Sequence, residues 1–279
     1  MVISSEFVSR EDIRNRKFGE VWHTLIPYVF KDVPEYYDVG NAVASLGTYP
    51  LWTRTFARVV HARMNDLPRG AKVLDVASGT HDIPLRLLAM NPGLEVHAVD
   101  GSSAMIAEGQ RIAKERNFTI HAQVCDAHSL PFPDASFDVV TIQFASRHLE
   151  VIRAFSEIYR VLKPGGLFCH NDMLRPSSRI IEVPYLIFLR ASVWCTSRLF
   201  GASKEARRCV GYFADAIHNF YTPEEMTALL YELGFTNVAK RSLLTGTMCY
   251  HIAQKSMKAD RYLLELFADP VPEERATMR

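Results

Sequence analysis

The stretch Val73-Leu74-Asp75-Val76-Ala77-Ser78-Gly79-Thr80-His81-Asp82 decides the fold of this 279-residue chain. It combines an apolar strand that carries an acid, a tight turn of small residues and the start of a helix near Ile83. Open α/β folds bind nucleotide-like ligands where such a turn meets the carboxyl edge of a parallel sheet. We therefore expect a ligand site at this turn.

Two further strand ends carry acids. Residues 94–100 form a second predicted strand that ends at Asp100, and the helical run 103–116 follows it. An acid at this position accepts hydrogen bonds from the two hydroxyls of a ribose. A third tip, Asp126-Ala127, suits the edge of an adenine, and the buried strand 137–142 comes next. Together these tips predict a binding site for a nucleoside.

Two ligands contain such a nucleoside: a dinucleotide and S-adenosylmethionine. A dinucleotide requires the spacing Gly-x-Gly-x-x-Gly, which lets a helix N-terminus approach the pyrophosphate. The turn here has one glycine, Gly79, so the pattern argues against a dinucleotide. A ligand without phosphates asks less of the backbone, and its amino-acid tail fits a polar turn made of Ser78, Thr80 and Asp82.

Composition and length limit the function classes. The hydrophobic content of 48% fits one α/β domain with additions, and the formal charge of +1 gives no reason to expect a nucleic-acid partner. The five cysteines are scattered, without a Cys-x-x-Cys pair or a secretory leader, which indicates reduced thiols and a cytoplasmic chain. No apolar run is expected to span a bilayer, since Arg190 and Arg198 interrupt the longest, residues 183–200. We expect a covering or interfacial helix there.

The chain order predicts a doubly wound, mostly parallel sheet with helical additions. Strands and helices alternate over residues 73–173, and a closing pair of strands is expected at 238–243 and 248–253. An aromatic N-terminal lid precedes them, in which Pro27, Pro34 and Pro50 are expected to separate short helices. The predicted organisation is a lid at 1–65, a main domain at 66–255 with a helical cover at 176–216, and a tail at 256–279.

Two local signals mark helix ends. Lys163-Pro164-Gly165-Gly166 predicts the end of a helix over 151–162, with the fifth strand at 167–173. Thr222-Pro223-Glu224-Glu225 predicts a helix start, with Thr222 as N-cap and acids in the first turn.

These motifs resemble those of class I S-adenosylmethionine-dependent methyltransferases. The chain looks most like the C-methyltransferases of ubiquinone and menaquinone biosynthesis. The motifs that carry the resemblance are residues 75–82, Asp100, Asp126-Ala127, residues 130–138 and 160–166 for the class, and residues 37–41 and 45–47, Trp52, residues 144–147 and 244–246 for the narrower family.

The resemblance implies a seven-stranded Rossmann-like sheet and a set of cofactor contacts. The residues expected to bind S-adenosylmethionine, and S-adenosylhomocysteine after transfer, are Asp75, Ser78, Gly79, Thr80, Asp100, Gly101, Ser102, Met105, Asp126, Ala127 and Gln143. The partner would be a small hydrophobic acceptor such as a prenylated quinol. Peripheral membrane contact and a homodimer are left open.

The resemblance also implies catalytic residues. A ring carbon of a quinol is a poor nucleophile until a ring hydroxyl loses its proton, so a base is needed directly or through water. Tyr37, Asp82 and Arg147 are expected to face the acceptor: Arg147 stabilises the phenolate, Asp82 takes the proton through water, and Tyr37 orients the ring. His148 is the reserve candidate for the base.

Plainer roles compete with these. Asp82 is better explained as a cap of the helix beginning at Ile83 or as a residue that orients the cofactor than as a base. Tyr37 would equally be one more aromatic of the lid core. His81, His148, His170 and Asp172 match no metal motif and are expected to be polar lining. Residues 183–200 are either an apolar wall, with or without membrane contact, or a cap helix on the sheet.

The chain departs from the family pattern at several positions: His81 for glycine or alanine, His148 for asparagine, Gly40 for methionine, Ala42 for aspartate and Asp172 for glutamate. The departures at 42, 81 and 148 favour an acceptor other than a quinol, such as a lipid head group or a specialised metabolite. A third hypothesis is a cofactor-binding accessory protein without catalytic activity.

Overall fold

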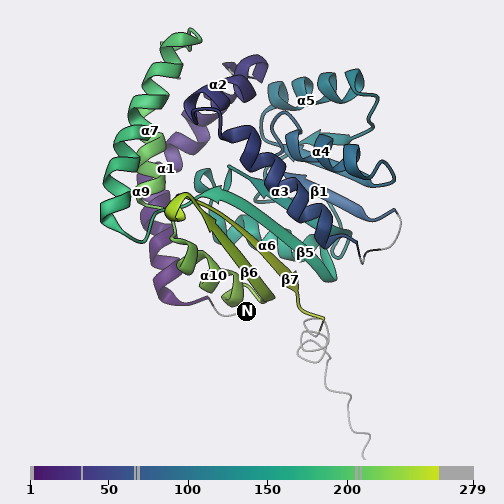
Figure 1. Cartoon of the computed structure of the whole chain (residues 1–279). Coiled ribbons are helices and arrows are strands. Elements are labelled where there is room, and N and C mark those ends of the chain that lie inside the picture. Colours follow the sequence, from purple (N-terminus) through teal and green to yellow (C-terminus); the bar gives the residue numbers. More distant parts are fainter. Residues whose placement is uncertain are drawn as a thin grey trace, which may run out of the picture.

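The computed structural model describes residues 3–32, 34–65, 67, 70–204, 207 and 209–257 (Figure 1). Beyond its first two residues, the expected tail at 256–279 lies outside these ranges.

Seven strands form one sheet with the order β3-β2-β1-β4-β5-β7-β6. All neighbours are parallel except β7, which is antiparallel to both β5 and β6. The order reverses between β1 and β4, which is where doubly wound sheets open a crevice for ligands. The predicted fold class is confirmed. The strands are β1 Lys72–Val76, β2 Glu95–Asp100, β3 His121–Val124, β4 Phe137–Gln143, β5 Leu162–Met173, β6 Phe235–Leu243 and β7 Met248–Lys255.

Helices cover both faces of the sheet, because alternate strand residues point to opposite sides. Val73 and Val139 pack with α3 (Tyr49–Arg63), α4 (Asp82–Met90) and α5 (Ser103–Glu115) on one face. Leu74 and Val140 pack with α6 (Val151–Val161) and α10 (Pro223–Glu232) on the other. In Figure 1, α3 crosses in front of the sheet. The α10 start has the predicted capping box between Thr222 and Glu225.

The predicted start of the fifth strand is wrong by five residues. β5 begins at Leu162, which pairs with Phe137, and the pairing register shifts before Leu167 pairs with Val139. Gly165 takes a φ of 76° within this irregular stretch. The proline and glycines therefore make a bulge inside the strand rather than a loop before it.

The N-terminal region contains one long helix where two short ones were expected. α1 (Ser5–Asp32) continues through Pro27, although a proline removes one backbone hydrogen bond. Buried apolar side chains on either side of Pro27, namely Trp22, Ile26 and Val29, hold this part of the helix against α9 (Val210–His218). Pro34 does begin a separate 3-10 turn, η1 (Pro34–Tyr36), before α2 (Tyr37–Ala44), and Pro50 lies at the start of α3.

The expected cover after β5 consists of α7 (Arg179–Leu199) and α9 (Val210–His218). Among the described residues, α7 alone has the length and apolar composition of a membrane-spanning helix, so the expectation that no run reaches this length is wrong. One side of α7 packs on α9: Leu186 contacts Ala214 and Ile217, and Arg190 pairs with Asp215 at 2.7 Å. α7 is therefore a covering helix in this fold.

Candidate active site

A cleft lies at the carboxyl ends of β1 to β4, next to the α1 residues Trp22, His23 and Ile26. We call it the cofactor cleft. Eight of the predicted cofactor residues line it: Gly79, Asp100, Gly101, Ser102, Met105, Asp126, Ala127 and Gln143.

Asp100 organises the centre of this cleft. Its two carboxylate oxygens accept hydrogen bonds from the backbone N–H of Gly79 at 2.9 Å and of Ser102 at 2.8 Å. Burial raises the pKa of Asp100 above the ordinary aspartate value, while these two bonds oppose the shift. A carboxylate has about four acceptor positions, so two remain for the hydroxyls of a ribose. The turn after β1 and the start of α5 are thus joined through one side chain.

The edges of the cleft are fixed by other short contacts. The Ser102 hydroxyl donates to the carbonyl of Phe30 at 3.1 Å and so joins α1 to the end of β2. The amide of Asn171 donates to Gln143 at 3.1 Å. Asp126 accepts from the backbone and ring of His128, yet its side chain is 60% exposed. This third tip is the most open part of the cleft.

Asp75, Ser78 and Thr80 lie near the cleft without lining it. Thr141 donates to the Asp75 carboxyl beneath the sheet edge, and burial raises the pKa of Asp75 to about 7. The Thr80 hydroxyl donates to Asp38 of α2 at 3.1 Å. These three predicted cofactor residues therefore support the turn after β1 without lining the cofactor cleft.

The His81 imidazole does not obstruct the cleft. His81 has a φ of 64°, and its ring is fully buried against α5, where a Cβ on Gly109 would come within 2.4 Å of it. Ser78 Oγ lies 2.9 Å from the ring Nδ1, and burial lowers the pKa of His81 to about 4. The missing side chain at Gly109 therefore makes the space that the histidine fills.

A second, largely apolar cavity adjoins the cleft. We call it the acceptor cavity. Its walls come from α2, α3, α7, α9 and the end of β4, and include Tyr37, Trp52, Phe144, Arg147, Phe188 and Phe213. Phe30, Tyr37 and Phe144 line both spaces. The two spaces therefore meet at these aromatic rings.

Among the described residues that line the acceptor cavity, the charged one is Arg147, which comes from η2 (Ser146–His148). It forms a buried ion pair with Asp172, whose other oxygen accepts from Ser146. Ser146 also lies 2.9 Å from Nε2 of His170, which is fully buried and lines neither space. The expectation that His81, His148, His170 and Asp172 line the site is therefore wrong for His81, His170 and Asp172. Within the described part of the chain, no group of His, Cys, Asp and Glu side chains has a metal-binding arrangement.

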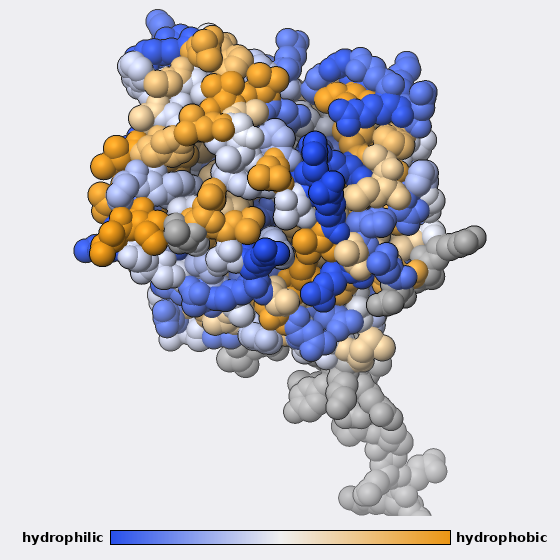
Figure 2. Space-filling view, viewed as in Figure 1, coloured by the Kyte–Doolittle hydropathy of each residue, from blue (hydrophilic) through white to orange (hydrophobic). Residues whose placement is uncertain are grey.

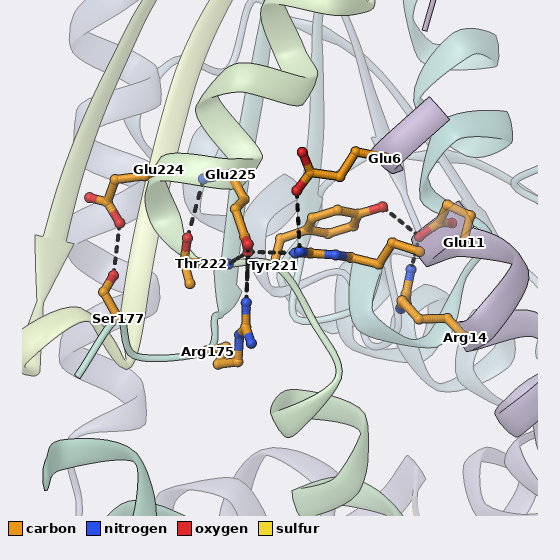
Figure 3. A network of polar contacts seen from close by, with 10 residues as sticks. Glu6, Glu11, Arg14, Arg175, Ser177, Tyr221, Thr222, Glu224 and Glu225 are labelled. Carbon is orange, nitrogen blue, oxygen red and sulfur yellow. Dashed lines mark hydrogen bonds and ion pairs between the residues drawn. The ribbon is translucent and has the colours of Figure 1, made fainter. Parts of the chain in front are cut away.

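The N-terminal helix fixes the loop that carries Arg147. Arg14, which is fully buried, donates to the backbone carbonyls of Arg147 at 3.1 Å and Leu149 at 3.2 Å. Glu11 pairs with Arg14 and accepts from Tyr221 at 2.7 Å (Figure 3). Further along the network, Glu225 accepts from Arg175 at 3.0 Å. The loop therefore depends on segments from both ends of the chain.

The other predicted catalytic residues separate into two groups. Tyr37 lines both spaces, and burial raises the pKa of its phenol to about 12, so it remains a hydrogen-bond donor at neutral pH. Asp82 lines neither space: it is the first residue of α4 and pairs with Arg86 at 2.9 Å. His81 occupies the N-cap position, so the alternative of Asp82 as the cap is also wrong.

Three residues of this architecture were not predicted. Asp38 accepts from Tyr49 and Thr80 and so ties the lid to the turn after β1; its place beside Tyr37 in the lid motif was the available signal. Arg14 and Tyr212 contact the loop after β4 from distant parts of the sequence. No local pattern marks either of them.

The sequence of this chain is similar to those of known methyltransferases. A model of the ubiE/COQ5 methyltransferase family matches residues 19–255. A demethylmenaquinone methyltransferase of Symbiobacterium thermophilum is 34% identical over 236 residues, which cover 81% of this chain and 91% of the relative.

Two solved structures show the same fold. The CurJ carbon methyltransferase has a TM-score of 0.57 at 15% identity and covers 75% of this chain and 55% of that one. The geranyl diphosphate C-methyltransferase of Streptomyces coelicolor A3(2), solved with S-adenosyl-L-homocysteine, has a TM-score of 0.54 at 14% identity and covers 72% and 78%. The chain therefore belongs to the ubiE/COQ5 methyltransferase family and is an S-adenosylmethionine-dependent methyltransferase, not a non-catalytic accessory protein.

Proposed function

We propose that this methyltransferase transfers the methyl group of S-adenosylmethionine to a ring carbon of a prenylated quinol of the demethylmenaquinol type. The observation that carries the proposal is the acceptor cavity, which is walled by aromatic rings and is lined by one buried arginine whose charge acts on Tyr37, a residue that both spaces share. An apolar cavity with a single cation suits a flat apolar ring that becomes an anion when it reacts. The name of the Symbiobacterium relative supports the same acceptor.

The cofactor in this proposal occupies the cofactor cleft. Asp100 accepts hydrogen bonds from the ribose hydroxyls, and Asp126 and Ala127 flank the adenine. Gly79 leaves room for the amino-acid tail. Phe30, Tyr37 and Phe144, which line both spaces, would then be the side chains next to the methyl group to be transferred.

The reaction is a displacement at the methyl carbon. The acceptor loses a hydroxyl proton to water, and Arg147 and the Tyr37 hydroxyl stabilise the resulting oxyanion. The ring carbon forms a bond to the methyl group while the carbon–sulfur bond breaks, and its electron pair returns to sulfur to give S-adenosylhomocysteine. The methylated ring carbon then loses its proton, which restores the aromatic ring.

Isotope transfer tests this proposal. The protein is incubated with methyl-labelled S-adenosylmethionine and a short-tailed demethylmenaquinol, and the products are separated by mass. Label in a ring-methylated quinol is expected. Label that enters a phospholipid head group but never the quinol would instead support the alternative acceptor class.

We further propose that the outer side of α7 contacts a membrane and that the protein is cytoplasmic with peripheral attachment. Large apolar side chains are exposed on this helix, Ile180 at 86%, and Figure 2 shows apolar surface over the flank where Figure 1 places α7. The inner side of the same helix contributes Phe188, Leu189 and Val193 to the acceptor cavity. A prenyl tail would thus pass from the lipid to the cavity along one helix. The homodimer stays a prediction.

Sedimentation with phosphatidylcholine–phosphatidylglycerol vesicles tests the membrane contact. The double variant Ile180→Glu and Ile187→Glu is expected to bind vesicles about tenfold more weakly, since charges oppose insertion of an apolar face. It should still methylate the short-tailed quinol. Tyr231→Glu, on the exposed side of α10, is the matched control. Equal vesicle binding by all three proteins would contradict this contact.

A further inference from the structure

Several buried side chains around the site, including His81, Arg147 and His148, each have one nitrogen without a hydrogen-bond partner in the described structure. Of the two histidines, only His148 lines the cofactor cleft, and it is 6% exposed. Its ring packs edge-on against Phe30 at 6.4 Å and Phe213 at 5.7 Å, both of which line the acceptor cavity. Its Nε2 atom has no hydrogen-bond partner among the residues that the structure describes. A buried polar atom without a partner destabilises the folded protein unless a ligand supplies the missing hydrogen bond.

The other ring nitrogen belongs to a short chain of hydrogen bonds. The indole N–H of Trp22 donates to the Tyr212 hydroxyl at 2.8 Å, and an indole can only donate. The same hydroxyl lies 2.6 Å from Nδ1 of His148. Because its oxygen already accepts from Trp22, the hydroxyl hydrogen is available to donate to Nδ1.

This chain of bonds selects one tautomer of the imidazole. If Tyr212 donates to Nδ1, the ring proton is on Nε2, and one buried group, this N–H, is left for a ligand. If Nδ1 carried the proton instead, both the Tyr212 hydrogen and the Nε2 lone pair would be left without partners in the described structure. The first arrangement leaves fewer unpaired buried groups and is favoured. Burial and the nearby charges of Arg147 and Arg14 lower the pKa of His148 well below its ordinary value, so the ring is neutral.

The backbone holds this ring in place. Arg14 donates to the carbonyls of Arg147 and Leu149, the residues on either side of His148. The imidazole is therefore fixed by its own backbone, by Tyr212 and by the two phenylalanine rings. A donor with so little freedom is suited to select a ligand by the position of an oxygen atom.

We propose that His148 is a specificity-determining residue whose Nε2–H donates a hydrogen bond to a ring oxygen of the methyl acceptor. This inference rests on the proposed function and refines it, because it gives the histidine the role of a donor rather than the base predicted from the sequence. Arg147 and His148 then contact the acceptor from adjacent positions of one turn. A substrate oxygen that gains negative charge benefits most from such a donor.

Long-range ¹H–¹⁵N correlation spectra of histidine-labelled protein, saturated with S-adenosylhomocysteine and without quinol, test the tautomer directly. The Nε2–H form is expected for His148, and Tyr212→Phe should produce a mixture of the two forms. A pure Nδ1–H form in the unchanged protein would overturn the inference, whatever the acceptor is.

Kinetics with a short-tailed demethylmenaquinol test the ligand. His148→Phe keeps a ring without the donor and should raise KM for the quinol about tenfold, the effect of one lost hydrogen bond to a substrate. His148→Asn, which restores a donor, should recover most of this loss. The affinity for S-adenosylhomocysteine, measured by calorimetry, should change much less than the KM for the quinol, although His148 lines the cofactor cleft.

The outcomes separate the two proposals. Failure of the unchanged protein to methylate the quinol would refute the proposed function. An active protein in which His148→Phe weakens S-adenosylhomocysteine binding and leaves the KM for the quinol unchanged would place the donor on the cofactor and overturn this inference alone. Near-ultraviolet circular dichroism confirms that each variant is folded.

Discussion

The cofactor cleft and the acceptor cavity share three aromatic side chains but are formed by different kinds of chain segment. The cleft consists of consecutive strand ends, and its central acid bonds to backbone N–H groups of the two neighbouring turns. The cavity consists of side chains from separate helices and one loop, and that loop is held by a helix from the beginning of the chain. The comparison suggests that cofactor binding and acceptor alignment can be damaged independently.

The largest expected effect is a loss of activity when Arg147 of the acceptor cavity is replaced. Asp172 is fully buried, so Arg147→Lys is the informative change because it keeps a positive charge beside the carboxylate. Loss of the planar donor should lower kcat for the quinol by roughly 100- to 1000-fold, as for other oxyanion donors. Calorimetry should show unchanged affinity for S-adenosylhomocysteine. A parallel fall in that affinity would mean that the two spaces are not independent.

Removing Asp100, the central acid of the cleft, is expected to weaken cofactor binding instead. Asp100→Ala leaves the N–H groups of Gly79 and Ser102 without their acceptor and removes the ribose contacts. Affinity for S-adenosylhomocysteine should fall about 100-fold, which corresponds to roughly 2.7 kcal/mol. Asp126→Ala, at the open end of the cleft, should cost about tenfold or less, since exposed contacts contribute little. Equal losses in the two variants would contradict the central role of Asp100.

The contact of the His81 ring with Gly109 joins the turn after β1 to α5, and substitutions at these two positions test its contribution to stability. Gly109→Ala should lower the free energy of unfolding by about 1–3 kcal/mol, because its Cβ would meet the buried ring. His81→Gly in the same protein removes the ring and suits the left-handed φ at position 81, so the double variant should regain stability. Urea denaturation measures all three proteins. Additive losses would show that the two positions do not contact each other.

The last expected effect depends on pH and concerns Asp75, the acid behind the cleft. The pKa of Asp75 is about 7 in the folded protein and about 4 in an unfolded chain, so the native state binds more protons between these values. Its contribution to stability is therefore lost as the pH rises from about 4 to about 7. Asp75→Asn keeps an acceptor for Thr141 and should flatten the pH dependence of urea unfolding over this range. An unchanged slope would show that Asp75 does not titrate there.

Local sequence patterns predicted the cleft better than the cavity. The tips at Gly79, Asp100 and Asp126 follow apolar strands, and the parallel arrangement that brings such tips together is implied by the alternation of strands and helices. Tyr37 and Arg147 were expected at the acceptor from the family resemblance, and the structure brings both to the cavity wall.

The remaining features depend on contacts between distant segments. The position of the His81 ring depends on a missing side chain at Gly109, and the partner of His148 lies on α9, within the inserted helices. Arg14 is one of several arginines in an outwardly polar helix, and nothing nearby in the sequence distinguishes it from its neighbours. Pairs of this kind are fixed by tertiary packing, which no periodicity encodes.

The contacts of α1 have a consequence for the order of assembly during synthesis. Glu11 bonds to Tyr221 and to the backbone N–H of Val151, and Arg14 bonds to the carbonyls around His148. Domains generally begin to fold from the N-terminus as the ribosome extends the chain. Here α1 is translated well before its buried partners, and Glu11 cannot reach Tyr221 until the chain has been extended through α9. An incomplete nascent chain would thus leave the methyl-transfer loop unsupported and inactive.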